Sequence, residues 1–107
     1  MIEVIYYREH NCLTAEGHAR SDELGRDLVC AGVSTLVYTL AANVQQMEGS
    51  GQVRNMSLEL KEGNARISCD ASHKYRSTVE RIYQAVCVGF EILATEYPQF
   101  IRYEIRG

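Results

Sequence analysis

Two long segments with apolar residues at helical spacing dominate this sequence, and shorter segments that alternate between apolar and polar residues surround them. The first predicted helix follows Asp27 and ends at Gly49-Ser50-Gly51. The second begins between Ser72 and the capping-box pattern Ser77-Thr78-Val79-Glu80, and Pro98 ends it. Each helix needs a surface on which to bury its apolar side, and alternating strands form a sheet with one apolar face. We therefore expect helices packed on a sheet.

The alternating segments predict five strands, which pair into hairpins where only a short turn separates them. A turn at residues 8–11 separates the first two, and Glu62-Gly63-Asn64 separates the third and fourth. The predicted strands are residues 2–7, 12–18, 54–61, 65–69 and 100–106. The order β-β-α-β-β-α-β predicts an α+β fold, a two-layer sandwich with two helices packed on one face of a five-stranded sheet. The 107 residues fit a single domain spanning 1–107.

Composition and charge limit the classes of partner. A net charge of −3 argues against binding along a phosphate backbone, so we expect no direct nucleic-acid partner, and it suits a basic peptide. The apolar run from Leu28 to Ala42 is interrupted by Ser34, Thr35 and Thr39, and no signal-peptide pattern precedes it, so we expect no membrane segment. We expect a cytoplasmic protein whose four cysteines are reduced thiols.

A histidine and a cysteine stand on either side of a polar segment that contains glycine. His18 ends the second predicted strand, and Cys30 is expected in the first turn of the first helix. A helix N-terminus stabilises a thiolate, and an imidazole on a neighbouring element can take the thiol proton. The pair is therefore a candidate nucleophile and base of a small cysteine protease. The alternative is structural, with Cys30 in the core and His18 at a strand end.

Two residues near Cys30 are candidate supporting groups. Ser34 follows Cys30 by four residues, so its hydroxyl is expected on the same helix face as the sulfur. Asp27 has two competing roles: it caps the helix, or it orients His18 as the third member of a triad. Capping is favoured because aspartate is common at that position.

The segment between the histidine and the cysteine is predicted to contact substrate. Residues 19–26 are expected to form a loop that closes over an extended peptide, with Gly25 as its hinge. Leu24 is a candidate contact for an apolar side chain of the substrate. Gly17 predicts a bulge or a close backbone approach just before His18.

The other three cysteines are predicted to be structural. Cys69 and Cys87 fall on apolar faces, and Cys12 lies within a strand. No CxxC or HxxxH spacing accompanies them, so we expect neither a metal site nor a cofactor. His73, near the start of the second helix, is expected to be a solvated surface residue.

Two separated blocks of the sequence resemble a known signature. Gly17-His18-Ala19, then Gly25, then Asp27-Leu28-Val29-Cys30-Ala31-Gly32-Val33-Ser34 is similar to the motif of the bacterial ribosomal-processing cysteine protease family, Prp. The resemblance covers the whole chain in length and element order. It implies that Cys30 is the nucleophile and His18 its base, with Asp27 and Ser34 as supporting residues. It also implies a homodimer.

The resemblance further implies a substrate and a part in ribosome biogenesis. The family removes a short N-terminal extension from a large-subunit ribosomal protein, the twenty-seventh in the usual count, after an aromatic pair, before an alanine and ahead of a basic segment. The alternative is a non-catalytic, ribosome-associated protein-binding module in which Cys30 is unreactive. A thiol redox enzyme is less favoured, because no second cysteine lies near Cys30 in the sequence.

Overall fold

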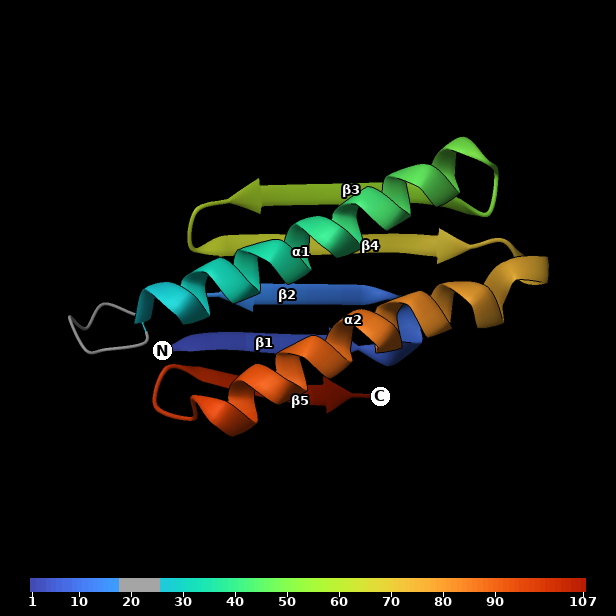
Figure 1. Cartoon of the computed structure of the whole chain (residues 1–107). Coiled ribbons are helices and arrows are strands. Elements are labelled where there is room, and N and C mark those ends of the chain that lie inside the picture. The colour runs from blue at the N-terminus through green and yellow to red at the C-terminus, as the bar shows by residue number, and fades with distance from the viewer. Residues whose placement is uncertain (18–25) are drawn as a thin grey trace.

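The computed structural model describes residues 1–17 and 26–107. The order of strands and helices is the predicted one, with two short 3₁₀ helices in addition (Figure 1). The elements are β1 (Ile2–Tyr7), η1 (Arg8–His10), β2 (Cys12–Glu16), α1 (Arg26–Gly49), β3 (Val53–Lys61), β4 (Asn64–Ala71), η2 (His73–Tyr75), α2 (Arg76–Glu96) and β5 (Ile101–Arg106).

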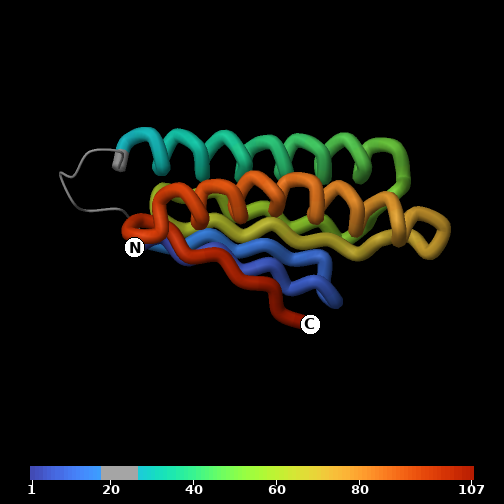
Figure 2. Tube along the Cα trace, turned by 60° about the horizontal axis from the view of Figure 1, so that its bottom comes forward, coloured from blue at the N-terminus to red at the C-terminus, as the bar shows by residue number. Residues whose placement is uncertain are grey.

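The five strands form one mixed sheet in the order β3-β4-β2-β1-β5. The pairs β1–β2 and β3–β4 are the predicted antiparallel hairpins, β2 pairs with β4 in the same sense, and β5 runs parallel to β1. Both helices lie on the same face of this sheet, which Figure 2 shows in side view. The predicted two-layer α+β sandwich is therefore confirmed.

The core lies between the two helices and the sheet. Its largest fully buried side chains come from all three parts: Tyr6 and Leu13 from the sheet, Leu40 from α1, and Tyr83 and Phe90 from α2. The rings of Tyr6 and Tyr83 stack with their centroids 5.7 Å apart, which ties α2 to the interior strand β1.

The two helices approach each other closely because small residues face leucines at their interface. Gly32 of α1 lies against Leu93, and Gly89 of α2 lies against Leu36. A side chain at Gly89 would meet the methyl groups of Leu36 at 2.5 and 2.9 Å. The two glycines therefore make room for the leucines of the opposite helix.

The edge strand β3 contains a bulge that the alternation of its side chains had concealed. Val53 is buried, and Leu58 pairs with Ile67 on the same, helix-covered face, although an odd and an even position should point to opposite faces. One additional residue between Arg54 and Ser57 restores the match, and Asn55 there has a positive φ of 53°. The sequence pattern predicted a strand from residue 54 and missed Val53 for this reason.

The start of α2 lies within the range that the sequence predicted. The helix begins at Arg76, so Ser77 of the capping-box pattern lies inside it, and Tyr75 precedes it without a side-chain capping bond.

The apolar character of α1 is greater than the interruptions by hydroxyl residues suggested. Asp27–Gly49 is long and apolar enough to cross a membrane by length and composition. Core helices pass the same test, and Leu40 of α1 is fully buried against the rest of the core.

Two buried tyrosines predict opposite effects of the same substitution. The Tyr83 hydroxyl donates to the carbonyl of Ile67 at 3.3 Å, whereas the Tyr6 hydroxyl has no hydrogen-bond partner among the described residues. Tyr83→Phe should lower the free energy of unfolding by about 1 kcal/mol, because it removes a buried hydrogen bond. Tyr6→Phe should leave that energy unchanged or raise it, since it removes an unpaired buried oxygen. Urea denaturation of both variants checks this, and equal losses would contradict it.

Candidate active site

A cavity of about 320 Å³ lies between the first half of α1 and one end of the sheet. Five residues of α1 line it, together with the β3–β4 turn and the adjoining ends of β1 and β2. Its apolar wall consists of Ile2, Ala15, Val33, Val37 and Leu60. Cys30 and Ser34 contribute the polar atoms from the helix side. Three of the residues singled out in the sequence, Gly17, Cys30 and Ser34, thus meet in one place.

Cys30 differs from the other three cysteines in its surroundings. It is half-buried and lines the cavity, whereas Cys12, Cys69 and Cys87 are buried. Burial raises the pKa of each of those three thiols, which makes them poor nucleophiles. Their predicted structural character fits these positions. Cys12 nevertheless lies outside the core cluster that holds the other two.

The described part of α1 begins at Arg26, and Asp27 lies in its first turn. The two roles considered for Asp27, capping the helix and orienting His18, stay predictions. A carboxylate there still interacts favourably with the positive end of the helix dipole. Cys30 is the fifth residue of α1 and so begins the second turn. Ser34 follows one turn later and is exposed at the same cavity.

Three predicted site residues, His18, Leu24 and Gly25, lie outside the described residues. Their roles as base, substrate contact and hinge therefore remain predictions. The residue before His18 is described, and it is Gly17.

Gly17 makes the close backbone approach that the sequence predicted. Its φ is +104°, and its N–H donates to the carbonyl oxygen of Gly63 in the β3–β4 turn at 2.9 Å. A Cβ atom at this position would clash with the carbonyl oxygen of Met1. Position 17, just after β2, therefore requires glycine, because the backbone there passes close to both Met1 and the β3–β4 turn. The contact fixes the point from which the chain continues to His18.

One carboxylate lies at the rim of the cavity near the hydrogen bond between Gly17 and Gly63. Glu62, the residue before Gly63, is exposed and lines the cavity, and the exposed Lys61 lines it beside Glu62. The described lining thus carries one negative and one positive side chain.

Sequence reasoning missed several residues of the cavity wall. Tyr38 continues the spacing of Cys30 and Ser34 by a further four residues, so helical periodicity alone was sufficient to find it. Leu60 and Glu62 belong to the β3–β4 hairpin, and only the packing of that hairpin beside α1 brings them to the cavity. No local pattern connects them with Cys30.

Comparison with known proteins supports a specific class of enzyme. Residues 1–102 match the family described as cysteine protease Prp. The ribosomal processing cysteine protease Prp of Mycoplasma pneumoniae is 31% identical over 99 residues, which cover 89% of this chain and 87% of that protein.

Solved structures share the fold. A Streptococcus mutans protein superposes with a TM-score of 0.68 at 28% identity, covering 98% of this chain and 91% of its own. The Staphylococcus aureus ribosomal processing protease Prp, solved with a substrate peptide, superposes with a TM-score of 0.70 at 21% identity, covering 98% and 97%.

The two glycines Gly17 and Gly51 allow a controlled test of the close approach. Both have positive φ, but a Cβ atom at Gly51 would meet nothing within 4 Å. Gly51→Ala should therefore cost only the strain of the left-handed backbone, about 1–2 kcal/mol of unfolding free energy. Gly17→Ala adds the clash with Met1 and should cost about 3 kcal/mol or more. Urea denaturation followed by circular dichroism measures both, and equal costs would show that the approach to Met1 is not restrictive.

Proposed function

Because the chain belongs to the cysteine protease Prp family, we propose that Cys30 and His18 form its catalytic dyad and that it removes the N-terminal extension of a large-subunit ribosomal protein, the twenty-seventh. The observation that carries the assignment of Cys30 is its position. Of the four cysteines, all of which are described, it is the one that is not buried, and it opens onto a cavity beside the residue that precedes His18. The Mycoplasma pneumoniae relative is named for ribosomal processing.

The proposed reaction proceeds through an acyl-enzyme. His18 takes the proton of the Cys30 thiol, and the thiolate attacks the scissile carbonyl carbon. The resulting oxyanion accepts hydrogen bonds from the first backbone amides of α1, which have no partner within the helix. The C–N bond then breaks, and the His18 imidazolium protonates the leaving amine. His18 next removes a proton from water, which hydrolyses the thioester and releases the carboxylic acid.

The apolar wall of the cavity suits the aromatic residues expected before the cut. Ile2, Ala15 and Leu60 from the sheet face Val33 and Val37 from α1 across a space of about 320 Å³. Burying an aromatic ring there removes a large apolar area from water, which stabilises the bound peptide. A substrate aromatic side chain bound in this cavity would place the peptide bond that follows it toward Cys30, at the edge of the same cavity.

The charge of the chain suits the basic segment expected after the cut. The chain as a whole carries a net charge of −3, and Glu62 is a carboxylate of the cavity lining. A field of this sign raises the rate at which a basic peptide reaches the site, and a carboxylate at the cavity helps to set its direction. Lys61, beside Glu62 in the lining, opposes this effect locally.

The proposal extends to assembly and location. A homodimer would supply further walls for an extended substrate, which a chain of 107 residues cannot enclose alone. Its substrate is made in the bacterial cytoplasm, and we place the protein there. The alternative of a non-catalytic ribosome-associated module requires an unreactive Cys30, and membership of a cysteine protease family counts against it.

Substitution of the dyad separates these alternatives. Cys30→Ser and His18→Ala should each reduce cleavage of a peptide that spans the aromatic pair and the alanine by at least about a thousandfold, because each removes a member of one catalytic unit. Cys87→Ala and His73→Ala are matched controls, since Cys87 is buried in the core and His73 is exposed on η2. Both should retain the wild-type rate. Mass spectrometry of the products measures the rates, and substantial turnover by Cys30→Ser would reject Cys30 as the nucleophile.

The Glu62 carboxylate at the cavity predicts a dependence on the substrate's basic residues. Glu62→Gln should lower kcat/KM for a peptide with a basic segment about two- to fivefold at low salt, and the difference should shrink at high salt. Glu48→Gln, an exposed position at the far end of α1, changes the net charge equally and should have little effect. A peptide with neutral residues after the cut is the second control. If kcat/KM for the neutral peptide fell by the same factor in the Glu62→Gln variant, recognition of the basic segment by the Glu62 charge would be excluded.

A further inference from the structure

Two exposed apolar side chains line the cavity beside Cys30. Tyr38 of α1 is 59% exposed and Leu60 of β3 is 37% exposed, and both belong to the cavity wall. Single exposed apolar residues are common on protein surfaces, but two on facing walls of one cavity form an apolar site that a ligand can cover. The proposed reaction gives no role to Tyr38.

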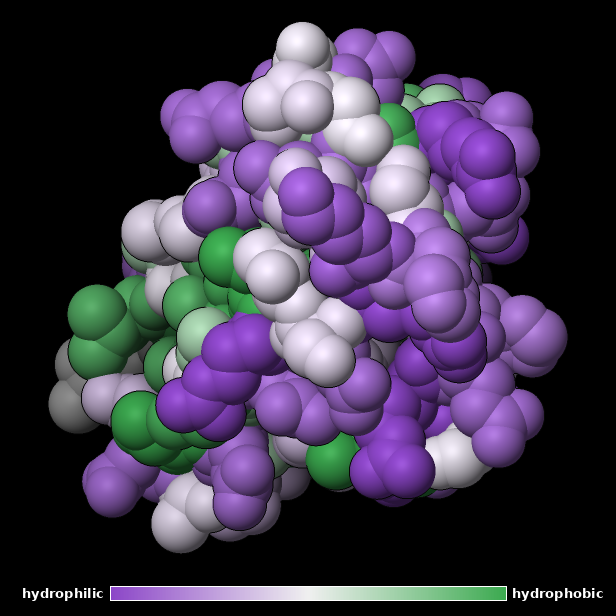
Figure 3. Space-filling view, turned by 90° about the vertical axis from the view of Figure 1, so that its right-hand side faces the viewer, coloured by the Kyte–Doolittle hydropathy of each residue, from purple (hydrophilic) through white to green (hydrophobic). Residues whose placement is uncertain are grey.

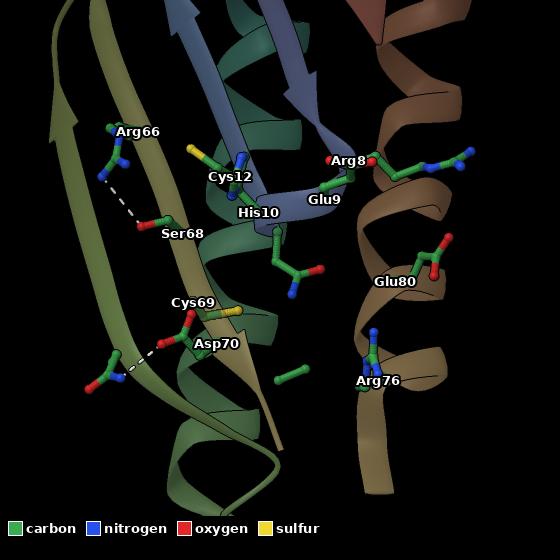
Figure 4. A pocket seen from close by; sticks show the side chains of 13 residues that line it. Arg8, Glu9, His10, Cys12, Arg66, Ser68, Cys69, Asp70, Arg76 and Glu80 are labelled. Carbon is green, nitrogen blue, oxygen red and sulfur yellow. Dashed lines mark hydrogen bonds between the residues drawn. The ribbon is translucent and has the colours of Figure 1, made fainter. Parts of the chain in front are cut away.

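A larger cavity, of about 630 Å³, lies at the other end of the molecule and has a different chemistry (Figure 4). Figure 3 views the molecule from this end, where hydrophilic side chains predominate. None of the exposed large apolar side chains among the described residues lines this cavity. Its charged side chains are Arg8, Glu9, Arg66, Asp70, Arg76 and Glu80. Because the arginines and carboxylates balance, this cavity indicates no particular ligand, whereas the apolar wall beside Cys30 favours an apolar one.

Tyr38 forms the end of the Cys30 cavity on the helix side. Cys30, Ser34 and Tyr38 follow one another at intervals of four residues, so they form one row along α1. Such a row is inclined to the helix axis, and here it leads from the half-buried Cys30 to the exposed Tyr38. Ala42, the next residue of the row, is exposed and does not line the cavity. Tyr38 therefore lies at the mouth of the cavity, farthest along α1 from Cys30.

The distance along the helix determines which part of a bound peptide reaches Tyr38. A helix rises about 1.5 Å per residue, so Tyr38 lies about 12 Å along α1 from Cys30. An extended peptide advances about 3.3 Å per residue, so it covers this distance with three or four residues. The apolar wall that suits the aromatic residues before the cut lies along the same part of α1. The peptide residue beside Tyr38 is therefore the third or fourth before the scissile bond.

The Tyr38 side chain is suited to hold an extended peptide. Within the part of the chain that the structure describes, its hydroxyl group makes no hydrogen bond, in contrast to the hydroxyl of the buried Tyr83. The Tyr38 ring can pack on an apolar side chain while its hydroxyl donates to a backbone carbonyl of the peptide. Tyrosine is common among the residues that contribute most to peptide and protein binding for this reason.

We propose that Tyr38 and Leu60 form a subsite that binds an apolar side chain at the third or fourth position before the cut. This inference rests on the proposed function, because the peptide must reach Cys30 for these positions to be defined. The Tyr38 ring packs on the side chain from α1, and Leu60 packs on it from the β3–β4 hairpin. The subsite extends recognition beyond the aromatic pair to a longer segment of the substrate.

Peptide binding to the Cys30→Ser chain tests the subsite without a need for turnover. The probe is a fluorescent peptide with the aromatic pair and with leucine at both the third and fourth positions before the cut. Adding Tyr38→Ala should raise its Kd about tenfold, because the ring is lost while alanine keeps the helix intact. A second peptide, with alanine at both positions, should already bind about tenfold more weakly and should lose little further affinity. Fluorescence anisotropy measures each Kd.

Ile92→Ala is the matched control for Tyr38→Ala. Ile92 of α2 is 58% exposed, as Tyr38 nearly is, but it does not line the cavity. Its substitution should leave the Kd of both peptides unchanged. Tyr38→Phe should raise the Kd of the leucine peptide less than about threefold, since it keeps the ring and removes only one hydrogen bond.

Three outcomes would overturn the proposal. The first is an unchanged Kd of the leucine peptide in Tyr38→Ala, and the second is an equal loss of affinity for both peptides. The third is a change in self-association on sedimentation that accounts for the loss, which would assign Tyr38 to a contact between copies. A chain that binds the leucine peptide through Tyr38 but cleaves no peptide would retain the subsite and lose the proposed reaction. Cleavage that Tyr38→Ala leaves unchanged would do the reverse, and no saturable binding of either peptide would overturn both.

Discussion

The packing of α1 against the sheet is the interaction on which the rest of the structure depends. Val29 and Leu40 are fully buried, and together they fix the rotation of the helix about its axis. Successive residues of a helix point about 100° apart, so Cys30 is turned from the core toward the flank at which the cavity opens. Ser34, one turn later, follows it. The Cys30 thiol is thus positioned by the burial of the residue before it, and α2 holds α1 in place through the contact between Gly32 and Leu93.

Much of the fold was predictable because the decisive signals are local. Apolar spacing identified both helices, and short turns identified both hairpins. The strand order and the parallel pairing of β1 with β5 were not predictable, since they depend on contacts between distant segments. The bulge at Asn55 shows the other limit: inserting one residue exchanges the faces of a strand, and alternation read along the sequence cannot reveal it. The start of α2 fell within its predicted range, and the helix follows the η2 turn without a side-chain cap.

In the candidate site, as in the fold, local sequence patterns identified some residues, whereas contacts between distant segments placed the others. Gly17, Cys30 and Ser34 were identified from residue type and spacing, and all three line one cavity. The facing wall, with Leu60 and Glu62, was not identified, because the hairpin that supplies it carries no sign of its neighbour in its own sequence.

The parallel pairing of β1 with β5 has a consequence for the order of events during synthesis. Strand β1 lies in the interior of the sheet, and its outer neighbour is β5, with the Ile2 amide donating to the carbonyl of Phe100 at 2.8 Å. Ile2 also lines the wall beside Cys30. One side of β1 therefore stays without a partner until residues 101–106 have been translated. A nascent chain cannot complete this wall before that point, so the peptidase becomes competent only after β5 has been made.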